Sequence, residues 1–232
     1  MIELINTPGF WAAVLQIIAI DILLSGDNAI VIALACRSLP PKQRRLGIFW
    51  GVVGAISLRV VLTFFAVGLL SLPWLKLIGG ALLLWIGIQL LIPEASDEPN
   101  IKPADHLWGA IRTIIIADFV MSLDNVIGVA AAAKDNVYLL AFGLLLSVPL
   151  IAWSSQLVLK VMERFPVVIV LGAGLLGWVA GGMMLGDVAI SAWVKLQLVA
   201  WPQVHYLVPA LCTVLVVVAG KALERRMLRR RR

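Results

Sequence analysis

Long apolar runs constrain this chain more than any other feature of its sequence. Of its 232 residues, 62% are hydrophobic, whereas a soluble domain is usually near half apolar. Several runs reach roughly 20 residues, the length that a helix needs to cross a bilayer. Only helices and closed barrels satisfy their backbone hydrogen bonds in lipid, and no alternating strand pattern is visible. The sequence therefore predicts an all-α polytopic membrane protein.

Seven transmembrane helices are expected from these runs. The expected spans are 10–36, 46–70, 73–92, 109–133, 137–159, 166–187 and 205–223. Lys and Arg fall almost entirely on one side of them, in the connections near 37–45, 102–112 and 160–164 and after the last span. The positive-inside rule then places the N-terminus outside and the C-terminus in the cytoplasm.

The C-terminal segment RRMLRRRR accounts for much of the net charge of +6. A basic cluster directly after a membrane span is typical of binding to anionic lipid headgroups. Nothing else in the chain favours nucleic acid as a partner. The tail is thus expected to contact membrane lipid.

Two polar segments interrupt the apolar runs and match each other. DILLSGDN, residues 21–28, and DFVMSLDN, residues 118–125, align without gaps. The third spans of the two halves also match, because Pro73 aligns with Pro166, Gly79 with Gly172 and Trp85 with Trp178. The chain therefore contains an internal repeat.

Each repeat holds three spans, so the second enters the membrane in the opposite orientation. Inverted repeats of this kind are found in secondary transporters, which bind substrate near the bilayer midplane. We expect one transmembrane domain over residues 1–232. Its expected parts are repeat one at about 10–92, a cytoplasmic linker at about 93–107, repeat two at about 108–187, a seventh helix at about 205–223 and a basic tail at 224–232.

Both polar segments lie near the centres of their spans, so the pseudo-twofold axis is expected to bring them together. The side chains that would meet are Asp21, Asp27, Asp118 and Asp124, with Asn28, Asn125, Ser25 and Ser122. Four ionised carboxylates in hydrocarbon are costly unless they are paired. Arg59, in the second span, can neutralise one, and a divalent cation is the natural further partner. Carboxylate, amide and hydroxyl oxygens suit Mg, Ca and Mn.

Other interpretations of these polar residues stay open. Asn and Ser also hold membrane helices together, at about 0.6 kcal/mol each, which is an alternative role for Ser25 and Ser122. On a regular helix Asp27 points roughly 120° away from Asn28 and its face, so either the helix unwinds near Gly26 or Asp27 has another partner. Asp187 is expected to be solvated near a span end.

The paired D-x-x-x-S-x-D-N segments, followed by AIVIALA and VIGVAAAA, resemble the TerC family of integral membrane proteins, which is grouped with LysE-type exporters. The family is named for tellurium resistance, and its members are implicated in manganese export. The resemblance implies a transporter in the bacterial inner (plasma) membrane. It also implies metal-ligand roles for Asp21, Asp27, Asn28, Asp118, Asp124 and Asn125.

The leading hypothesis is a secondary transporter that exports Mn²⁺ as its substrate ion, with protons as counter-ion, and that is not an enzyme. No P-loop occurs, and no prosthetic group is expected. One alternative is a membrane scaffold that aids metalation or insertion of exported proteins. Another is an intramembrane metal-dependent enzyme, since paired Asp residues can do acid–base chemistry. No oligomeric state is predicted.

Overall fold

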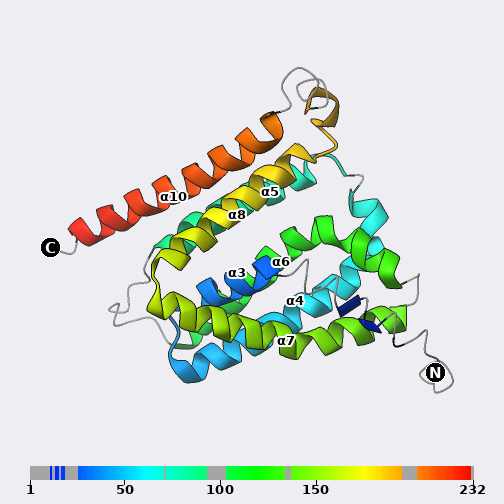
Figure 1. The fold of residues 1–232 in the computed structure, drawn as a ribbon, viewed down its shortest axis with the longest axis horizontal. Coiled ribbons are helices and arrows are strands. Elements are labelled where there is room, and N and C mark those ends of the chain that lie inside the picture. The colour runs from blue at the N-terminus through cyan, green and yellow to red at the C-terminus, as the bar shows by residue number, and fades with distance from the viewer. Residues whose placement is uncertain are drawn as a thin grey trace.

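The described part of the chain is helical and contains no strand (Figure 1). The computed structural model describes residues 11, 14, 15, 17, 18, 26–70, 72–92, 103–133, 137–194 and 203–230. The helices are α3 (Gly26–Cys36), α4 (Pro41–Leu70), α5 (Leu75–Leu91), α6 (Pro103–Ala133), α7 (Val137–Arg164), α8 (Val167–Leu185) and α10 (Val204–Arg230). The expected all-α class is confirmed for these residues.

Among the described residues, 5 helices are long and apolar enough to cross a membrane, namely α4, α6, α7, α8 and α10. α3 and α5 are apolar but shorter, with 11 and 17 residues. Large apolar side chains such as Trp153, Leu171 and Leu211 are 67%, 65% and 66% exposed. Such an exterior suits lipid better than water.

Several helices extend beyond the spans expected from hydropathy. α6 begins at Pro103, within the stretch expected to be linker, and α7 continues to Arg164. α10 continues to Arg230, through most of the basic segment. Hydropathy reports only the apolar length, whereas a helix satisfies its own backbone and can continue beyond the apolar region with polar side chains. Of the first expected span, the described residues include α3 and a few earlier positions.

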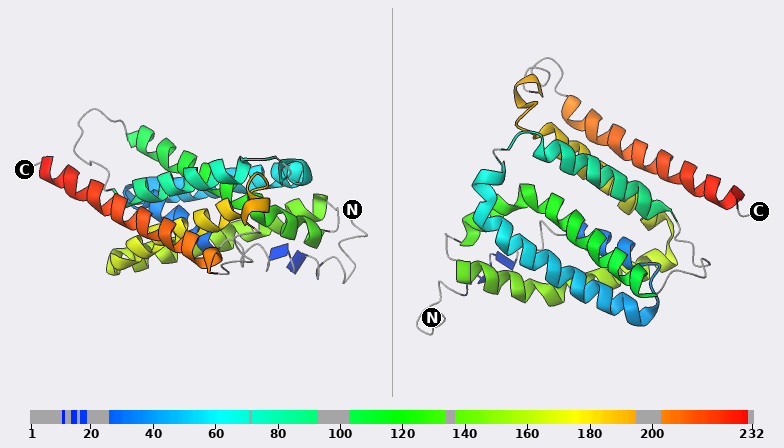
Figure 2. Two further views of the ribbon diagram at one scale, coloured as in Figure 1. Left: turned by 90° about the horizontal axis from the view of Figure 1, so that it is seen from above. Right: turned by 180° about the vertical axis from the view of Figure 1, so that it is seen from behind.

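The helices divide into two groups that lie side by side (Figures 1 and 2). We call α3, α4, α6 and α7 the four-helix group, and α5, α8 and α10 the three-helix group. In the four-helix group α4 runs parallel to α6, with Gly51 against Ile114 and Gly54 against Ile115. Each group takes helices from both halves of the sequence. The two groups therefore do not coincide with the two sequence repeats.

Glycines bring the helices of the three-helix group close together. A Cβ atom on Gly80 of α5 would lie 2.9 Å from the carbonyl oxygen of Ala180 in α8. A Cβ atom on Gly177 of α8 would lie 2.7 Å from the carbonyl oxygen of Cys212 in α10. Small residues at helix contacts are the usual means of close packing in membranes. These helices therefore form a tightly packed unit.

Asp187, just after α8, binds the beginning of α5, so the expectation that it is solvated is wrong. Its side chain is 0% exposed. The carboxylate accepts hydrogen bonds from the backbone N–H groups of Ala189 (2.7 Å), Trp74 (2.9 Å) and Leu77 (3.0 Å). The first N–H groups of a helix have no partner within it, and a carboxylate from the end of α8 satisfies those of α5.

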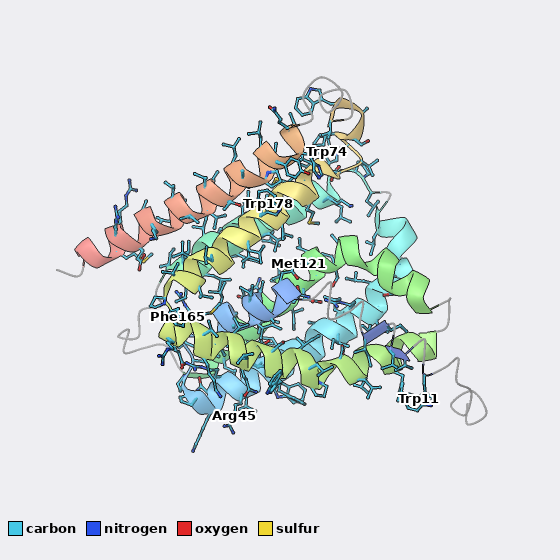
Figure 3. All side chains as sticks on the ribbon, viewed as in Figure 1. Trp11, Arg45, Trp74, Met121, Phe165 and Trp178 are labelled. Carbon is cyan, nitrogen blue, oxygen red and sulfur yellow. The ribbon has the colours of Figure 1, made fainter. Side chains whose placement is uncertain are left out.

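Basic side chains mark one end of the molecule. Arg44, near the start of α4, donates to Glu163, near the end of α7, at 2.5 Å. Figure 3 shows Arg45 extending outward at this end, where Phe165 also lies, while Trp74 lies at the opposite end of the helices. Arg45 and the Arg44–Glu163 pair therefore lie at the end of the structure that the positive-inside rule predicts to face the cytoplasm.

Candidate metal site in the four-helix group

Helix α6 carries the second aspartate segment without interruption. Residues 118–125 are helical throughout, so Asp118 and Ser122 lie one turn apart on the same face. Both side chains are buried, and the Ser122 hydroxyl donates to Asp118 Oδ2 at 3.1 Å. Their further hydrogen bonds show that this face of α6 is turned toward α4 and α3.

Arg59 of α4 supplies a positive charge next to Asp118. Its side chain is 2% exposed and is the largest of the fully buried side chains among the described residues. Its Nη2 donates to Asp118 Oδ1, and its Nε donates to Ser122 Oγ at 3.0 Å. An unpaired charge in an apolar interior is costly, so Arg59 and Asp118 each make the burial of the other possible.

Asn28 of α3 joins the first aspartate segment to the second. Its Nδ2 donates to Asp118 Oδ1 at 2.8 Å, and its side chain is 4% exposed. Its side-chain oxygen, Oδ1, is buried and has no hydrogen-bond partner within the described structure. Because buried polar groups are nearly always satisfied, this oxygen calls for a donor or a cation.

Asp27 lies at the start of α3, beside this network. Its Oδ1 accepts a hydrogen bond from the backbone N–H of Asn28 at 3.0 Å. The side chain is half-buried, and it interacts electrostatically with both Arg59 and Asp118. A second carboxylate therefore stands at the edge of the Asp118 network.

The structure thus joins several expected site residues through hydrogen bonds. The network consists of Asn28, Arg59, Asp118 and Ser122, with Asp27 beside it. Within the described residues, no three His, Cys, Asp or Glu side chains form a group able to hold a metal. Outside the described part lie Asp21, Ser25 and the side chains of Asp124 and Asn125. The metal-ligand roles of all the expected ligands stay predictions.

The pairing of Arg59 with Asp118 could not be predicted from the sequence motifs. The sequence indicates that Arg59 can neutralise one carboxylate, but not which one. The register of α4 against α6 decides it, since Gly51 faces Ile114 and Arg59 then falls beside Asp118. A lone arginine inside an apolar run indicates that a carboxylate lies nearby. The sequence does not give the register of α4 against α6, so it does not identify that carboxylate.

The network contains oxygen atoms that could bind a metal ion and one positively charged side chain, Arg59. The carboxylate of Asp118, the nearby carboxylate of Asp27 and the unpartnered Oδ1 of Asn28 are the ligand types that Mg²⁺, Ca²⁺ and Mn²⁺ prefer. No Cys or His takes part in the described network, in contrast to most zinc sites. The ligand atoms of the described network are therefore of the kind that hard divalent cations prefer.

Comparisons with known proteins point to one family. The integral membrane protein TerC family matches residues 6–228. The uncharacterized membrane protein YjbE of Bacillus subtilis is 44% identical over 208 residues, which cover 90% of this chain and 93% of that protein. The UPF0053 inner membrane protein YgdQ of Escherichia coli is 25% identical over 179 residues, or 70% of this chain and 75% of that protein. No solved structure matches the chain.

Proposed function

Because the chain belongs to the TerC family of integral membrane proteins, we propose that it is a secondary transporter that exports a divalent metal ion, manganese above all, from the cytoplasm. The ion binds between the first and fourth spans, and protons move in exchange. The protein performs no catalysis and carries no prosthetic group.

The hydrogen bond between Asn28 and Asp118 is the observation that carries this proposal. It joins polar side chains of the two matching segments at one buried place. An intramembrane carboxylate is costly and usually marks a pathway for ions or protons. A repeat whose two polar segments meet inside the helix bundle is the arrangement of a transporter site.

The choice of manganese rests on the resemblance to the family rather than on the ligands. The oxygen atoms of Asp and Asn accept Mg²⁺, Ca²⁺ and Mn²⁺ alike, and cavity size and ligand number separate them. The proposed ligand set is the one expected from the sequence, Asp21, Asp27, Asn28, Asp118, Asp124 and Asn125.

The proposed topology has seven spans and inverted three-helix repeats in the bacterial inner membrane. The contact of Asp187, at the end of α8, with Trp74, at the start of α5, supports it, because these third helices of the repeats run in opposite directions. The end bearing Arg44 and Arg45 faces the cytoplasm, in line with the positive-inside rule. The N-terminus is outside, and the C-terminal basic segment contacts anionic lipid.

Alternating access requires two bodies that move relative to each other. The helix grouping favours the four-helix group and the three-helix group as these bodies, instead of the two sequence repeats. Glycine contacts make the three-helix group a compact frame. The four-helix group carries the polar network and moves against this frame.

Cellular manganese content after a manganese challenge tests the proposal. Elemental analysis compares cells that lack a manganese exporter with the same cells carrying wild type, Asp27→Asn or Asn28→Ala. The matched control is Asp187→Asn, which makes the same chemical change at a buried Asp outside the site. Immunoblots of the membrane fraction equalise the amounts of protein.

Wild type and Asp187→Asn are expected to lower cellular manganese, while Asp27→Asn and Asn28→Ala are not. If all four chains lower it equally, the Asp and Asn side chains are not the transport site. If none changes any metal, a scaffold role in metalation or insertion replaces transport as the leading hypothesis.

A further inference from the structure

Arg59 contacts the Asp118 carboxylate, which is also a proposed ligand of the transported cation. Asp118 Oδ1 accepts hydrogen bonds from Arg59 Nη2 and Asn28 Nδ2, and Asp118 Oδ2 accepts one from Ser122 Oγ. Both oxygens of the carboxylate therefore have donors, and a full opposite charge lies beside it. A divalent ion on Asp118 meets the guanidinium at close range, where like charges in an apolar interior repel strongly. The ion and Arg59 therefore compete for Asp118.

Among the described residues, Arg59 contacts Ser122 and Asp118 through different nitrogen atoms. Nε donates to Ser122 Oγ at 3.0 Å, while Nη2 donates to Asp118 Oδ1. Loss of the contact with Asp118 does not require loss of the bond to Ser122. The side chain can therefore remain anchored while its charge moves off the carboxylate.

Asn28 marks the place where an incoming ion would be accepted. Its Nδ2 shares Asp118 Oδ1 with Arg59, and its own Oδ1 is buried and accepts no hydrogen bond from the described residues. A cation that displaces Arg59 from Asp118 gains this amide oxygen as a further ligand. Exchange of the two positive charges thus satisfies a polar atom that is unsatisfied while Arg59 is in place.

We infer that Arg59 is a tethered cation that alternates with the transported metal ion at Asp118. This inference rests on the proposed function and names the group that regulates its site. While no metal ion is bound, Arg59 neutralises Asp118. When the ion binds, it takes the carboxylate, and the guanidinium leaves Oδ1 while keeping Ser122. The Asp118 carboxylate is then not left unpaired in the bilayer when the protein returns without metal.

The second half of the chain has no counterpart to this charge. In α7, the helix that corresponds to α4, no Lys or Arg occurs from Val137 to Leu159. Arg59 therefore breaks the symmetry of the repeat. The tethered charge belongs to the Asp118 side of the site.

The test compares two transport modes of the purified full-length protein in liposomes. Exchange of labelled Mn²⁺ between two Mn²⁺-filled compartments needs only the metal-loaded carrier, whereas net Mn²⁺ efflux also needs the return of the carrier without metal. Arg59→Gln is expected to keep exchange, to lower net efflux by about tenfold, and to bind Mn²⁺ more tightly by a factor within the roughly 5- to 150-fold range of coupled sites. Arg44→Gln, at an ion pair outside the site, is the matched control and leaves both modes unchanged.

An equal loss of exchange and net efflux in Arg59→Gln would overturn the inference, because Arg59 would then only build the site. Unchanged net efflux would overturn it as well. Arg59→Lys serves if Arg59→Gln does not fold, since it keeps a cation but not the two-nitrogen contact; it is expected to keep exchange and lose part of net efflux. An equal loss of both modes in Arg59→Lys would overturn the inference. A wild-type protein that neither binds nor moves Mn²⁺ would instead overturn the proposed function, and this inference with it.

Discussion

In the four-helix group, α3, α4 and α6 meet through charged and amide side chains around Asp118, whereas in the three-helix group α8 and α10 meet through glycines such as Gly177. The polar contacts consist of donors and acceptors that can change partners. The glycine contacts consist of backbone against backbone and have no such alternatives. The two helix groups thus differ in the kind of contact that holds their helices together.

The largest expected effect comes from breaking the polar contact at its centre. Asp118→Asn removes the charge of the carboxylate that Arg59 contacts, and removing one partner of a buried ion pair typically costs about 3–5 kcal/mol. We expect a strongly lowered thermal unfolding midpoint in detergent, together with loss of manganese export. The double variant Asp118→Asn/Arg59→Gln removes both charges and should regain most of the stability without regaining export. A single variant as stable as wild type would contradict the importance of this pair.

A substitution that disturbs the glycine contacts of the three-helix group is expected to have a smaller effect, mainly on the stability of the protein. Gly177→Ala places a Cβ atom 2.7 Å from the Cys212 carbonyl oxygen, and overpacking of this kind costs about 1–3 kcal/mol. Thermal unfolding should begin at lower temperature, and Cys212 should react faster with a thiol reagent. Gly182→Ala is the control, because apart from its chain neighbours and the backbone of its own helix nothing lies within 4 Å of its added Cβ. Equal behaviour of the two variants would show that α8 and α10 are not closely packed.

Asp187 is a charged side chain that stabilises the three-helix group, in contrast to the glycine contacts of the same group. Asp187→Ala removes the acceptor for Trp74, Leu77 and Ala189 and should cost about 0.5–2 kcal/mol, as loss of a helix cap does. Metal export at equal protein amount should remain. Loss of export with stability unchanged would place Asp187 in the transport site instead.

The Asp187 carboxyl also predicts a dependence of stability on pH. Burial by itself raises the pKa of Asp187, but the hydrogen bonds from the backbone of Ala189, Leu77 and Trp74 outweigh burial and hold this pKa below its ordinary value. Its stabilisation is therefore complete above the unfolded pKa of about 3.9 and is lost as the pH falls through the lower folded pKa. Unfolding midpoints between neutral and acidic pH should fall less steeply for Asp187→Asn than for wild type. Parallel curves would contradict the charged cap.

The smallest effect is expected at the basic end. Arg44 and Glu163 form an ion pair in which the Glu163 side chain is 58% exposed, and such pairs contribute about 0.2–1 kcal/mol. Arg44→Gln should therefore lower stability slightly, and about 1 M salt should remove most of the difference. A large loss that persists in high salt would mean that Arg44 stabilises the fold by another route.

The sequence predicts the apolar spans, because hydropathy can be calculated from the residues alone. It also predicts that Asn28 and Asp118 lie close together, because they belong to the matching segments of an internal repeat. It does not predict that Asp187 caps α5, since the partners Trp74 and Leu77 are distant in sequence and meet only when α5 and α8 pack. The division into helix groups is likewise a matter of packing, which depends on where glycines allow close approach. Hydropathy does not show which helices pack against each other or in which register.

We propose that polar groups of both repeats form one divalent-cation site around Asp118. The most direct measurement is electron paramagnetic resonance of Mn²⁺ titrated into purified full-length protein, because binding removes the signal of free Mn²⁺. Wild type is expected to remove free Mn²⁺ in a saturable way, whereas Asn28→Ala should bind it weakly and Asp118→Asn/Arg59→Gln should not bind it. Folded variants that bind Mn²⁺ as tightly as wild type would contradict the claim.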